Sequence, residues 1–400
     1  MVSGGRARRF HFLDTAKIYL AFMRTRNRPE LRLTEPQKRV LIQLRVEGDM
    51  PRVRLGQALG IDGATMTRLT QQLIALDVVE EWETAEPQPR GRPMVPLRIS
   101  GRGGWTVGAT VHPGWLELAL VDFRGRPLVQ DSLPFDSPDP LVFARTLDRR
   151  LRALAAEHGF MRGKFLGAGV AVPGYALRAD RTRRAVVAWL SGWNDIPLAD
   201  VLGDALGMPV WIENDATAAA LAEYYQPDVI GRHRSALVLF LGHGIGGGLI
   251  TGRDLLLGEH GNSGEIGRLF PTGLPRPSGI DLIHSLRAAG TAIDSLSDLE
   301  AMLEPHAALI AQWTERVAGQ LNQAIASGVA WFDPGIVIIS GALPRPLLRD
   351  LADRLTALGP ERNSDYRAAT PAIHASPIGS AAVVIGAAMG PIHAVTAPGI

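Results

Sequence analysis

The stretch DGATMTRLTQQLIAL, residues 62–76, carries side chains that could read DNA bases. Leu69, Leu73 and Leu76 recur at helical spacing and predict one apolar stripe that faces a core. Small, hydroxyl, arginine and glutamine side chains then project from the other side or lie near the helix start: Ala64, Thr65, Thr67, Arg68 and Gln71. These types suit a helix that enters a major groove, so the pattern favours DNA binding.

A second group of candidates is Arg90-Gly91-Arg92, at the tip of a Pro/Gly-rich loop. The stretches on either side of this loop read as two strands, so we expect the wing of a β-hairpin. A glycine between two arginines lets the backbone lie close to DNA while the guanidinium groups reach a narrow minor groove or phosphates. The alternative is a three-helix interaction module that does not bind DNA.

Three short helices must position these residues. The first is expected after Thr34, the second runs to a stop at Gly60, and the third begins after Asp62, a possible N-cap. A tight Gly-Ile-Asp-Gly turn between the last two fits a helix-turn-helix. Residues 1–100 are therefore expected to form a winged helix-turn-helix domain, and the GRGG at 101–104 to be a hinge.

The net charge divides the chain at the same place. Residues 1–100 hold 17 lysines and arginines against 11 acids, a net charge of +6, whereas the remaining residues carry −4. A basic N-terminal quarter on an acidic body indicates a nucleic-acid partner for that quarter alone. The alternative is that these arginines cover an ordinary solvated face.

The composition narrows the classes of protein. Of the 400 residues, 46% are hydrophobic and 20% are charged, as in ordinary folded proteins of two or three domains. No uninterrupted apolar run approaches the ~18 residues needed to cross a bilayer, so no membrane partner is expected. There are no cysteines. That excludes disulfides and thiolate zinc sites, and a cytoplasmic location is the simplest expectation.

Residues 105–400 alternate between strand-like and helix-like segments, which favours an α/β domain with a mixed sheet. One strand turns into an alanine-rich helix at Asn214-Asp215. The stretch SALVLFLGHGIGGGLITG reads as two strands joined by a glycine-rich turn. Glycine-rich loops at the ends of several strands indicate a ligand site there.

Five stretches in this part resemble the ROK family, which groups sugar kinases with sugar-responsive transcriptional repressors. They are GAGVAVPG, SGWNDIPLADVLGDALGMPVWIENDATAAALAE, GHGIGGGLITGRDLLLGEHGNSGEIG, IISGAL and IGSAAVVIGAA. Their order and spacing make the match specific. The resemblance extends over essentially the whole chain, because family repressors carry an N-terminal winged helix-turn-helix. It implies a two-lobed, actin-like ATPase fold for residues 105–400.

The resemblance also implies which residues contact a sugar. The family's Asn-Asp pair corresponds to Asn214 and Asp215, the Glu of its Glu-x-Gly-His motif to Glu265, and a further acid to Asp281. Carboxylates can accept hydrogen bonds from sugar hydroxyls, and in family kinases the Asp is the catalytic base. The alternatives are a helix N-cap for the Asn-Asp pair and solvated loop carboxylates for the other two.

Two departures from the family pattern argue against phosphoryl transfer. Family kinases place an Asp and a Gly-Gly-Thr turn on the ATP phosphates and metal, where this chain has Thr110 and His112-Pro113-Gly114-Trp115. The second phosphate loop reads Gly242-His243-Gly244. Proline lacks an N–H donor, and tryptophan is bulky where phosphate must approach backbone amides. We therefore expect no catalytic residue, no cofactor and no enzymatic activity.

The zinc site of the family is also expected to be absent. Arg268 replaces its histidine, and the three cysteines are missing. An arginine stays protonated and cannot ligate a metal. Three roles remain for Arg268: pairing with Glu265 or Asp281 to stiffen the loop, holding an anionic ligand, or lying in solvent.

Together these features predict a transcriptional regulator, most simply a repressor, that binds double-stranded operator DNA and a sugar or sugar-derivative effector. A homodimer or a dimer of dimers is expected, since twofold symmetry suits palindromic half-sites. One alternative is an active ATP-dependent sugar kinase with a DNA-binding appendage. Another is a constitutive DNA-binding protein whose sugar domain is only a dimerisation scaffold.

Overall fold

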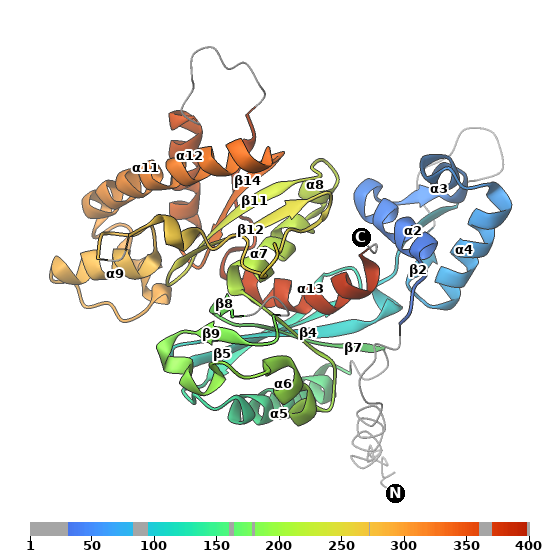
Figure 1. The fold of residues 1–400 in the computed structure, drawn as a ribbon, viewed down its shortest axis with the longest axis horizontal. Coiled ribbons are helices and arrows are strands. Elements are labelled where there is room, and N and C mark those ends of the chain that lie inside the picture. The colour runs from blue at the N-terminus through green and yellow to red at the C-terminus, as the bar shows by residue number, and fades with distance from the viewer. Residues whose placement is uncertain are drawn as a thin grey trace, which may run out of the picture.

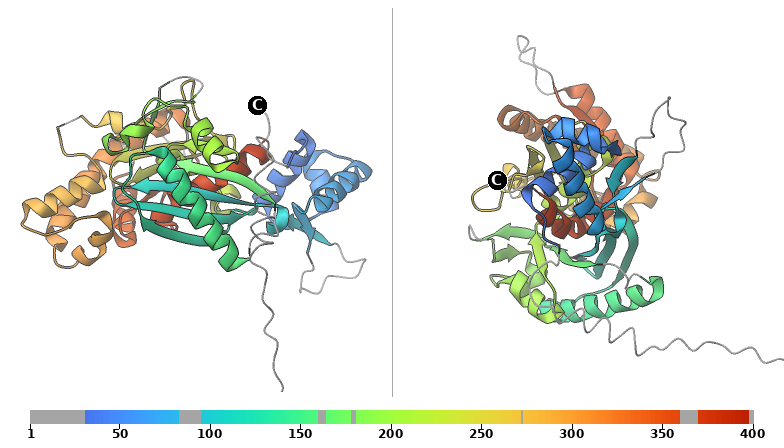
Figure 2. Two further views of the ribbon diagram at one scale, coloured as in Figure 1. Left: turned by 90° about the horizontal axis from the view of Figure 1, so that it is seen from below. Right: turned by 90° about the vertical axis from the view of Figure 1, so that its right-hand side faces the viewer.

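The computed structural model describes residues 31–82, 95–159, 164–177, 181–271, 273–359 and 370–397. These residues form an N-terminal unit and two lobes, and each lobe is built on a five-stranded sheet (Figure 1). The N-terminal unit lies at one end of the molecule, beside the first lobe and the C-terminal helix (Figure 2).

The described part of the N-terminal unit has three helices and a small antiparallel sheet in the order β1-β3-β2. Its elements are α2 (Glu35–Glu47), β1 (Met50–Pro51), α3 (Arg52–Leu59), α4 (Gly63–Ala75), β2 (Val79–Glu81) and β3 (Pro96–Ile99). Asp62 caps α4 by accepting a hydrogen bond from the Thr65 N–H at 3.0 Å. Gly60 ends α3 in the left-handed conformation. Both predicted helix signals are therefore confirmed.

The first lobe has a mixed sheet in the order β10-β7-β4-β5-β6 within the described residues. Its strands are β4 (Trp105–His112), β5 (Trp115–Asp122), β6 (Pro127–Pro134), β7 (Phe165–Ala171) and β10 (Val210–Glu213). Helices α5 (Pro140–His158) and α6 (Leu198–Leu206) cover one face, and α13 (Ala382–Thr396) covers the other (Figure 1). A hairpin of β8 (Gly174–Ala176) and β9 (Arg184–Val186) lies beside this sheet.

The second lobe repeats this plan, with a sheet in the order β13-β12-β11-β14-β15 in the described chain. Its strands are β11 (Ala236–Leu241), β12 (Ile245–Thr251), β13 (Asp254–Leu255), β14 (Ile336–Gly341) and β15 (Ala372–Ala375). One face packs on α9 (Gly279–Ala288), α11 (Ala307–Phe332) and α12 (Arg345–Leu358), and the other on α7 (Asp215–Tyr224) and α8 (Pro227–Ile230). The predicted α/β class with mixed sheets is confirmed.

The two lobes meet where α13 packs against α7 (Figure 1). Gly108 in β4 and Gly169 in β7 bring the first sheet so close to α13 that a Cβ at either position would lie within 1.9 Å of a helix carbonyl oxygen. Gly386 of α13 approaches α7 as closely, because its Cβ would lie 1.7 Å from the Ala218 carbonyl oxygen. Only glycine permits these contacts.

The C-terminal helix is apolar because it lies between the two sheets. Gly379–Thr396 is the one stretch of the described chain that is long and apolar enough to cross a membrane. However, 67% of it is buried inside the molecule, as expected for the core helix of a folded domain.

The predicted hinge is a packed turn. Gly101–Gly103 form one turn of 3₁₀ helix. Gly103 is buried, and a Cβ there would lie 2.9 Å from the Phe123 ring and from the Val78 side chain. The turn therefore fixes the N-terminal unit against the first lobe, and the glycines allow close packing instead of free movement.

Candidate functional site

The Asn-Asp pair lies where β10 gives way to α7. Asn214 caps this helix: its Oδ1 accepts hydrogen bonds from the N–H groups of Ala216 at 2.8 Å and Thr217 at 3.3 Å. Its Nδ2 donates to the Gly174 carbonyl at 2.8 Å. The oxygen has then used both lone pairs, and one amide hydrogen remains for another partner. Asn214 is thus a helix N-cap, and a ligand could receive only that one hydrogen from its side chain.

Asp215 is the first residue of α7. Its Oδ1 accepts a hydrogen bond from the Ala216 N–H at 2.9 Å, and among the described residues its Oδ2 accepts none. Burial raises the pKa of this carboxyl, while nearby His112 and Arg184 act in the opposite direction. A partly desolvated carboxylate with a free oxygen is suited to accept a hydrogen bond from a hydroxyl.

Glu265 is placed beside Asp215 by a tight glycine contact. Gly264 has a φ of +91°, and a Cβ there would lie 2.2 Å from the carbonyl oxygen of Gly247 in β12. Burial, and then the neighbouring charge of Asp215, raise the pKa of the Glu265 carboxyl, and Arg184 opposes this. The structure therefore brings these two predicted carboxylates into one site.

Arg184 in β9 is a member of this site that sequence patterns missed. Its side chain is 1% exposed and lies 3.8 Å from the Glu213 carboxylate. It donates to the Gly174 carbonyl at 3.3 Å, and its Nε has no hydrogen-bond partner among the described residues. Burial lowers the pKa of Arg184, while Glu213, Glu265 and Asp215 act to raise it. A buried cation among three carboxylates favours their ionised forms.

Two histidines occupy the positions of the two phosphate loops. His112 ends β4 and His243 lies in the turn between β11 and β12. Their ring centroids are 6.1 Å apart, and the ring planes lie at 27°. Thr110, at the position of the family's Asp, is fully buried and donates its hydroxyl to the Ala171 carbonyl at 3.1 Å. Imidazoles and a buried hydroxyl therefore stand where the resemblance implies groups that bind phosphate and metal.

Two other predicted residues are engaged elsewhere. Asp281, in the first turn of α9, accepts a hydrogen bond from the Trp313 indole at 2.8 Å and forms an ion pair with Arg316. Both partners lie on α11, so Asp281 joins two helices of the second lobe. Arg268 is exposed, and in the described part of the chain it makes no ion pair with Glu265 or Asp281. Of the three roles left open for Arg268, pairing with Asp281 does not occur in the structure, whereas the charge of Arg268 acts to lower the pKa of Glu265. A sugar contact of Arg268 or Asp281 stays a prediction.

The loop that lacks the family's zinc ligands is held by a different arginine. Arg276 donates from Nη2 to the Gly267 carbonyl at 2.6 Å, next to Arg268 in the chain. The described residues contain no group of three or more histidines and acids that could hold a metal ion. A hydrogen bond from a guanidinium therefore stabilises this loop.

The predicted DNA-contact face of α4 is open to solvent. Met66, Leu69 and Leu73 of this helix are buried, whereas four candidates are exposed and one is half-buried: Ala64, Thr67, Arg68, Gln71 and, half-buried, Thr65. The wing residues Arg90-Gly91-Arg92 lie outside the described residues. At the base of the hairpin, the Arg98 guanidinium carbon lies 3.2 Å from the centroid of the Trp82 ring.

Comparisons with known proteins agree with this architecture. The model of the ROK family matches residues 117–390, and the chain belongs to the ROK family. The uncharacterized protein y4fQ of Sinorhizobium fredii is 29% identical over 328 residues, which cover 82% of each chain. The xylose repressor of Bacillus subtilis is 25% identical over 236 residues, which cover 58% of this chain and 59% of the repressor.

Two solved structures share the fold. A ROK family transcriptional regulator, a homolog of the E. coli MLC protein, superposes with a TM-score of 0.64 at 20% identity and covers 91% of this chain and 97% of its own. The ROK hexokinase from Thermus thermophilus gives a TM-score of 0.52 at 26% identity, with 73% and 97% covered. The actin-like fold expected for the two lobes is thereby confirmed, and the regulator matches more of this chain than the hexokinase does.

Proposed function

We propose that this protein is a transcriptional regulator that binds operator DNA through its N-terminal unit and a sugar or sugar derivative through its two lobes. The exposed face of α4 carries the proposal, because Arg68 and Gln71 on it could reach base edges in a major groove. The three helices and the β2–β3 hairpin fit a winged helix-turn-helix. The likeness to a solved ROK regulator over 91% of the chain supports this assignment.

The effector site is proposed to be the cluster around Asp215 and Glu265. Carboxylate oxygens can accept several hydroxyl hydrogen bonds, and the free amide hydrogen of Asn214 can be donated to one more oxygen. Arg184 favours the ionised carboxylates that such contacts need. A ligand with several neighbouring hydroxyls fits this set of donors and acceptors.

The same geometry supports a regulator without enzymatic activity. Phosphoryl transfer depends on positioning and on neutralising phosphate charge. The buried hydroxyl of Thr110 and the rings of His112 and His243 supply neither a metal ligand of the required type nor a row of free backbone N–H groups. We further propose that the protein is cytoplasmic and forms a homodimer or a dimer of dimers. Two N-terminal units would then bind palindromic half-sites.

An ATP-dependent sugar kinase is the second candidate, and one observation favours it. Asp215 keeps a free oxygen and a raised pKa, as a general base for a sugar hydroxyl requires. The 26% identity with a ROK hexokinase is in line with this reading. Incubation with ATP, magnesium and a broad panel of sugars separates the two functions. We expect no turnover above background, and turnover that disappears in Asp215→Ala would replace the regulator with a kinase.

Selection of bound sequences from a random duplex library, followed by footprinting with the full chain, tests DNA binding. We expect two protected half-sites. Arg68→Ala should weaken binding by about 1–3 kcal/mol and relax the preference at one base position. Arg149→Ala, on the exposed face of α5, serves as the matched control and should bind like the parent. A parent protein that enriches no sequence would exclude the operator-binding role.

A thermal-shift screen against sugars and sugar phosphates tests the effector site. A ligand present at 100 times its Kd should add about 2.7 kcal/mol to the free energy of unfolding. The shift should be lost in Asp215→Asn, which keeps the shape of the side chain and removes its charge. A hit whose shift survives in both Asp215→Asn and Glu265→Gln binds somewhere else, and the proposed site is then wrong.

A further inference from the structure

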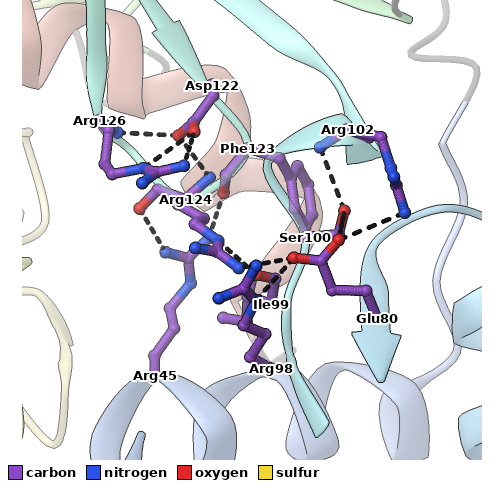
Figure 3. A network of polar contacts seen from close by, with 10 residues as sticks. All are labelled: Arg45, Glu80, Arg98, Ile99, Ser100, Arg102, Asp122, Phe123, Arg124 and Arg126. Carbon is purple, nitrogen blue, oxygen red and sulfur yellow. Dashed lines mark hydrogen bonds and ion pairs between the residues drawn. The ribbon is translucent and has the colours of Figure 1, made fainter. Parts of the chain in front are cut away.

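The N-terminal unit is anchored to the first lobe by the turn between β5 and β6. Arg124 in this turn donates to the Glu80 carboxylate in β2 at 2.9 Å and to the Ile99 carbonyl in β3 (Figure 3). Arg98 pairs with the same carboxylate at 2.7 Å. Asp122 shapes the turn by accepting a hydrogen bond from the Arg124 N–H at 2.9 Å. The two contacts of Arg124 therefore join the small sheet of the N-terminal unit to the first lobe, and Arg98 holds the shared carboxylate from within the sheet.

Arg45, near the end of α2, makes a contact of a different kind. Its guanidinium donates to the Phe123 carbonyl at 2.9 Å and to the Arg124 carbonyl at 3.2 Å, both in the same turn of the first lobe (Figure 3). The guanidinium carbon also lies 5.0 Å from the centroid of the Tyr225 ring. Tyr225 directly follows α7, which packs on the sheet of the second lobe. The Arg45 side chain therefore contacts both lobes.

Tyr225, on the side of Arg45 that faces the second lobe, is held by further polar contacts. The Tyr225 hydroxyl lies 2.8 Å from Nδ1 of His393 in α13, and Nε2 of His393 lies 2.7 Å from the Asp254 carboxylate in β13. The end of α2 also meets α8, since a Cβ at Gly231 would lie 3.0 Å from the Val46 carbonyl oxygen. A change in the position of the second lobe would therefore be expected to move α2.

Helix α7 joins this contact to the proposed effector site. Asp215 is its first residue, and Tyr225 follows its last, about 15 Å away at 1.5 Å per residue. A helix of this length moves as a rigid rod. A tilt of α7 about its N-terminal end would therefore move Tyr225 relative to the carbonyls of Phe123 and Arg124.

We propose that Arg45 couples the angle between the two lobes to the orientation of the N-terminal unit. The Arg124–Glu80 contact is the fixed anchor, and Arg45 is the positioning residue that makes α2 follow the second lobe. The proposal rests on the proposed function for its biological meaning, because effector binding beside Asp215 would then reorient the DNA-binding face.

Distance measurements between spin labels on the full chain test this coupling. The chain has no cysteine, so labels attach only to introduced ones. Three exposed positions report the three parts: Gln57 on α3, Arg149 on α5 and Arg349 on α12. The pair at 57 and 349 measures the N-terminal unit against the second lobe, and the pair at 57 and 149 measures it against the first.

In Arg45→Met we expect the distance distribution between positions 57 and 349 to broaden by about twofold or more, because the contact that selects one orientation is gone. The distribution between positions 57 and 149 should keep its width. The matched control is Arg39→Met, on the same helix. Its guanidinium donates to the Leu59 carbonyl within the N-terminal unit, so both distributions should stay as in the parent.

Two results would overturn the proposal. One is that both distance distributions keep their widths in Arg45→Met. The other is that both broaden equally, which would mean that Arg45 only holds the N-terminal unit to the rest of the molecule. If Arg45→Met does not fold, Arg45→Lys gives the same readout, since a lysine keeps the charge but lacks the planar fork that reaches two carbonyls. The measurement uses neither DNA nor sugar. If the protein bound no operator DNA, the proposed function would be excluded, but the role of Arg45 would still be decided by these distance measurements.

Discussion

His112 and His243 face each other across the two lobes, with 6.1 Å between their ring centroids. One ends a strand of the first sheet, and the other lies in a turn of the second. Burial, and then the proximity of His112, lower the pKa of His243. Two neutral rings can pack in this way, whereas two imidazolium rings would repel each other.

Acid should therefore weaken the junction between the lobes. His243 titrates near its ordinary pKa of about 6.5 in the unfolded chain and lower in the folded chain. The unfolded state then binds more protons as the pH falls below about 6.5, so the free energy of unfolding decreases there and is unaffected above. Urea unfolding of the parent and of His243→Gln, from about pH 5 to pH 8, measures this. A difference between the two proteins that does not depend on pH would contradict the lowered pKa.

Alkali should weaken the contact behind Arg45. Burial opposes the charge on His393, but the Tyr225 hydroxyl and the Asp254 carboxylate outweigh it and raise the pKa of His393 to about 9. Because the folded pKa lies above the unfolded one, this stabilisation is complete below about pH 6.5 and is lost as the pH rises through about 9. The stability difference between the parent and His393→Gln should shrink by on the order of 1–3 kcal/mol between about pH 7 and pH 10. A constant difference over that range would show that His393 is neutral.

The glycine contact that places Glu265 should not tolerate a methyl group. Gly264→Ala would put a Cβ 2.2 Å from the Gly247 carbonyl oxygen at a φ of +91°. We expect a loss of at least about 1–3 kcal/mol in the free energy of unfolding, together with weaker binding of any sugar found in the screen. Gly244→Ala is the control, since nothing lies within 4 Å of its Cβ. Equal stability of the two variants would mean that the loop is free to move away from β12.

Arg276, and not Arg268, should stabilise the loop at residues 264–270. Arg276→Ala removes a charged hydrogen bond to the Gly267 carbonyl and should lower the free energy of unfolding by about 1.5–3 kcal/mol. Arg268→Ala should stay within about 0.5 kcal/mol of the parent, because its side chain is exposed. Thermal melts without ligand compare the two. If Arg268→Ala melts lower, pairing of Arg268 with Glu265 is the better explanation.

Zinc should be absent from the purified protein. The chain has no cysteine and carries Arg268 at the position of the family's histidine. Elemental analysis should give well under one zinc per chain, and a chelator should leave the melting temperature unchanged. One tightly held zinc per chain would require ligands that neither the sequence motifs nor the described residues indicate.

Local signals in the sequence were sufficient for the elements and for part of the site. Asp62 and Asn214 both cap helices that begin at the predicted residue, because capping depends on neighbours two or three positions away. The partners of Asp281 could not be predicted in this way. They lie 32 and 35 residues further along the chain, and only the packing of α9 on α11 brings them together.

The roles of individual arginines are the hardest features to predict from the sequence. Arg184 follows two other arginines within four residues, and nothing in that run marks the one that is buried among carboxylates. Arg45 looks like a basic residue in the last turn of a helix, and its partners are backbone carbonyls that any sequence would supply. The glycine-rich run at 101–104 predicted a hinge, and this prediction was wrong. Gly103 is required for close packing against Phe123, and such packing depends on tertiary structure that local sequence does not reveal.

The close contact of Gly386 with α7 limits the ways in which the lobes could move. With no side chain at position 386, the two helix backbones approach closely, and Ala218, Ala219 and Ala222 of α7 are buried against α13 along the rest of the contact. Sliding of one helix along the other would drive the neighbouring side chains of α13 into the backbone of α7, so rotation about the closest point is the easier movement. A methyl group at position 386 would hold the two helices further apart. It would separate α13 from α7 and so disturb both the His112–His243 pair and the Tyr225–His393 contact.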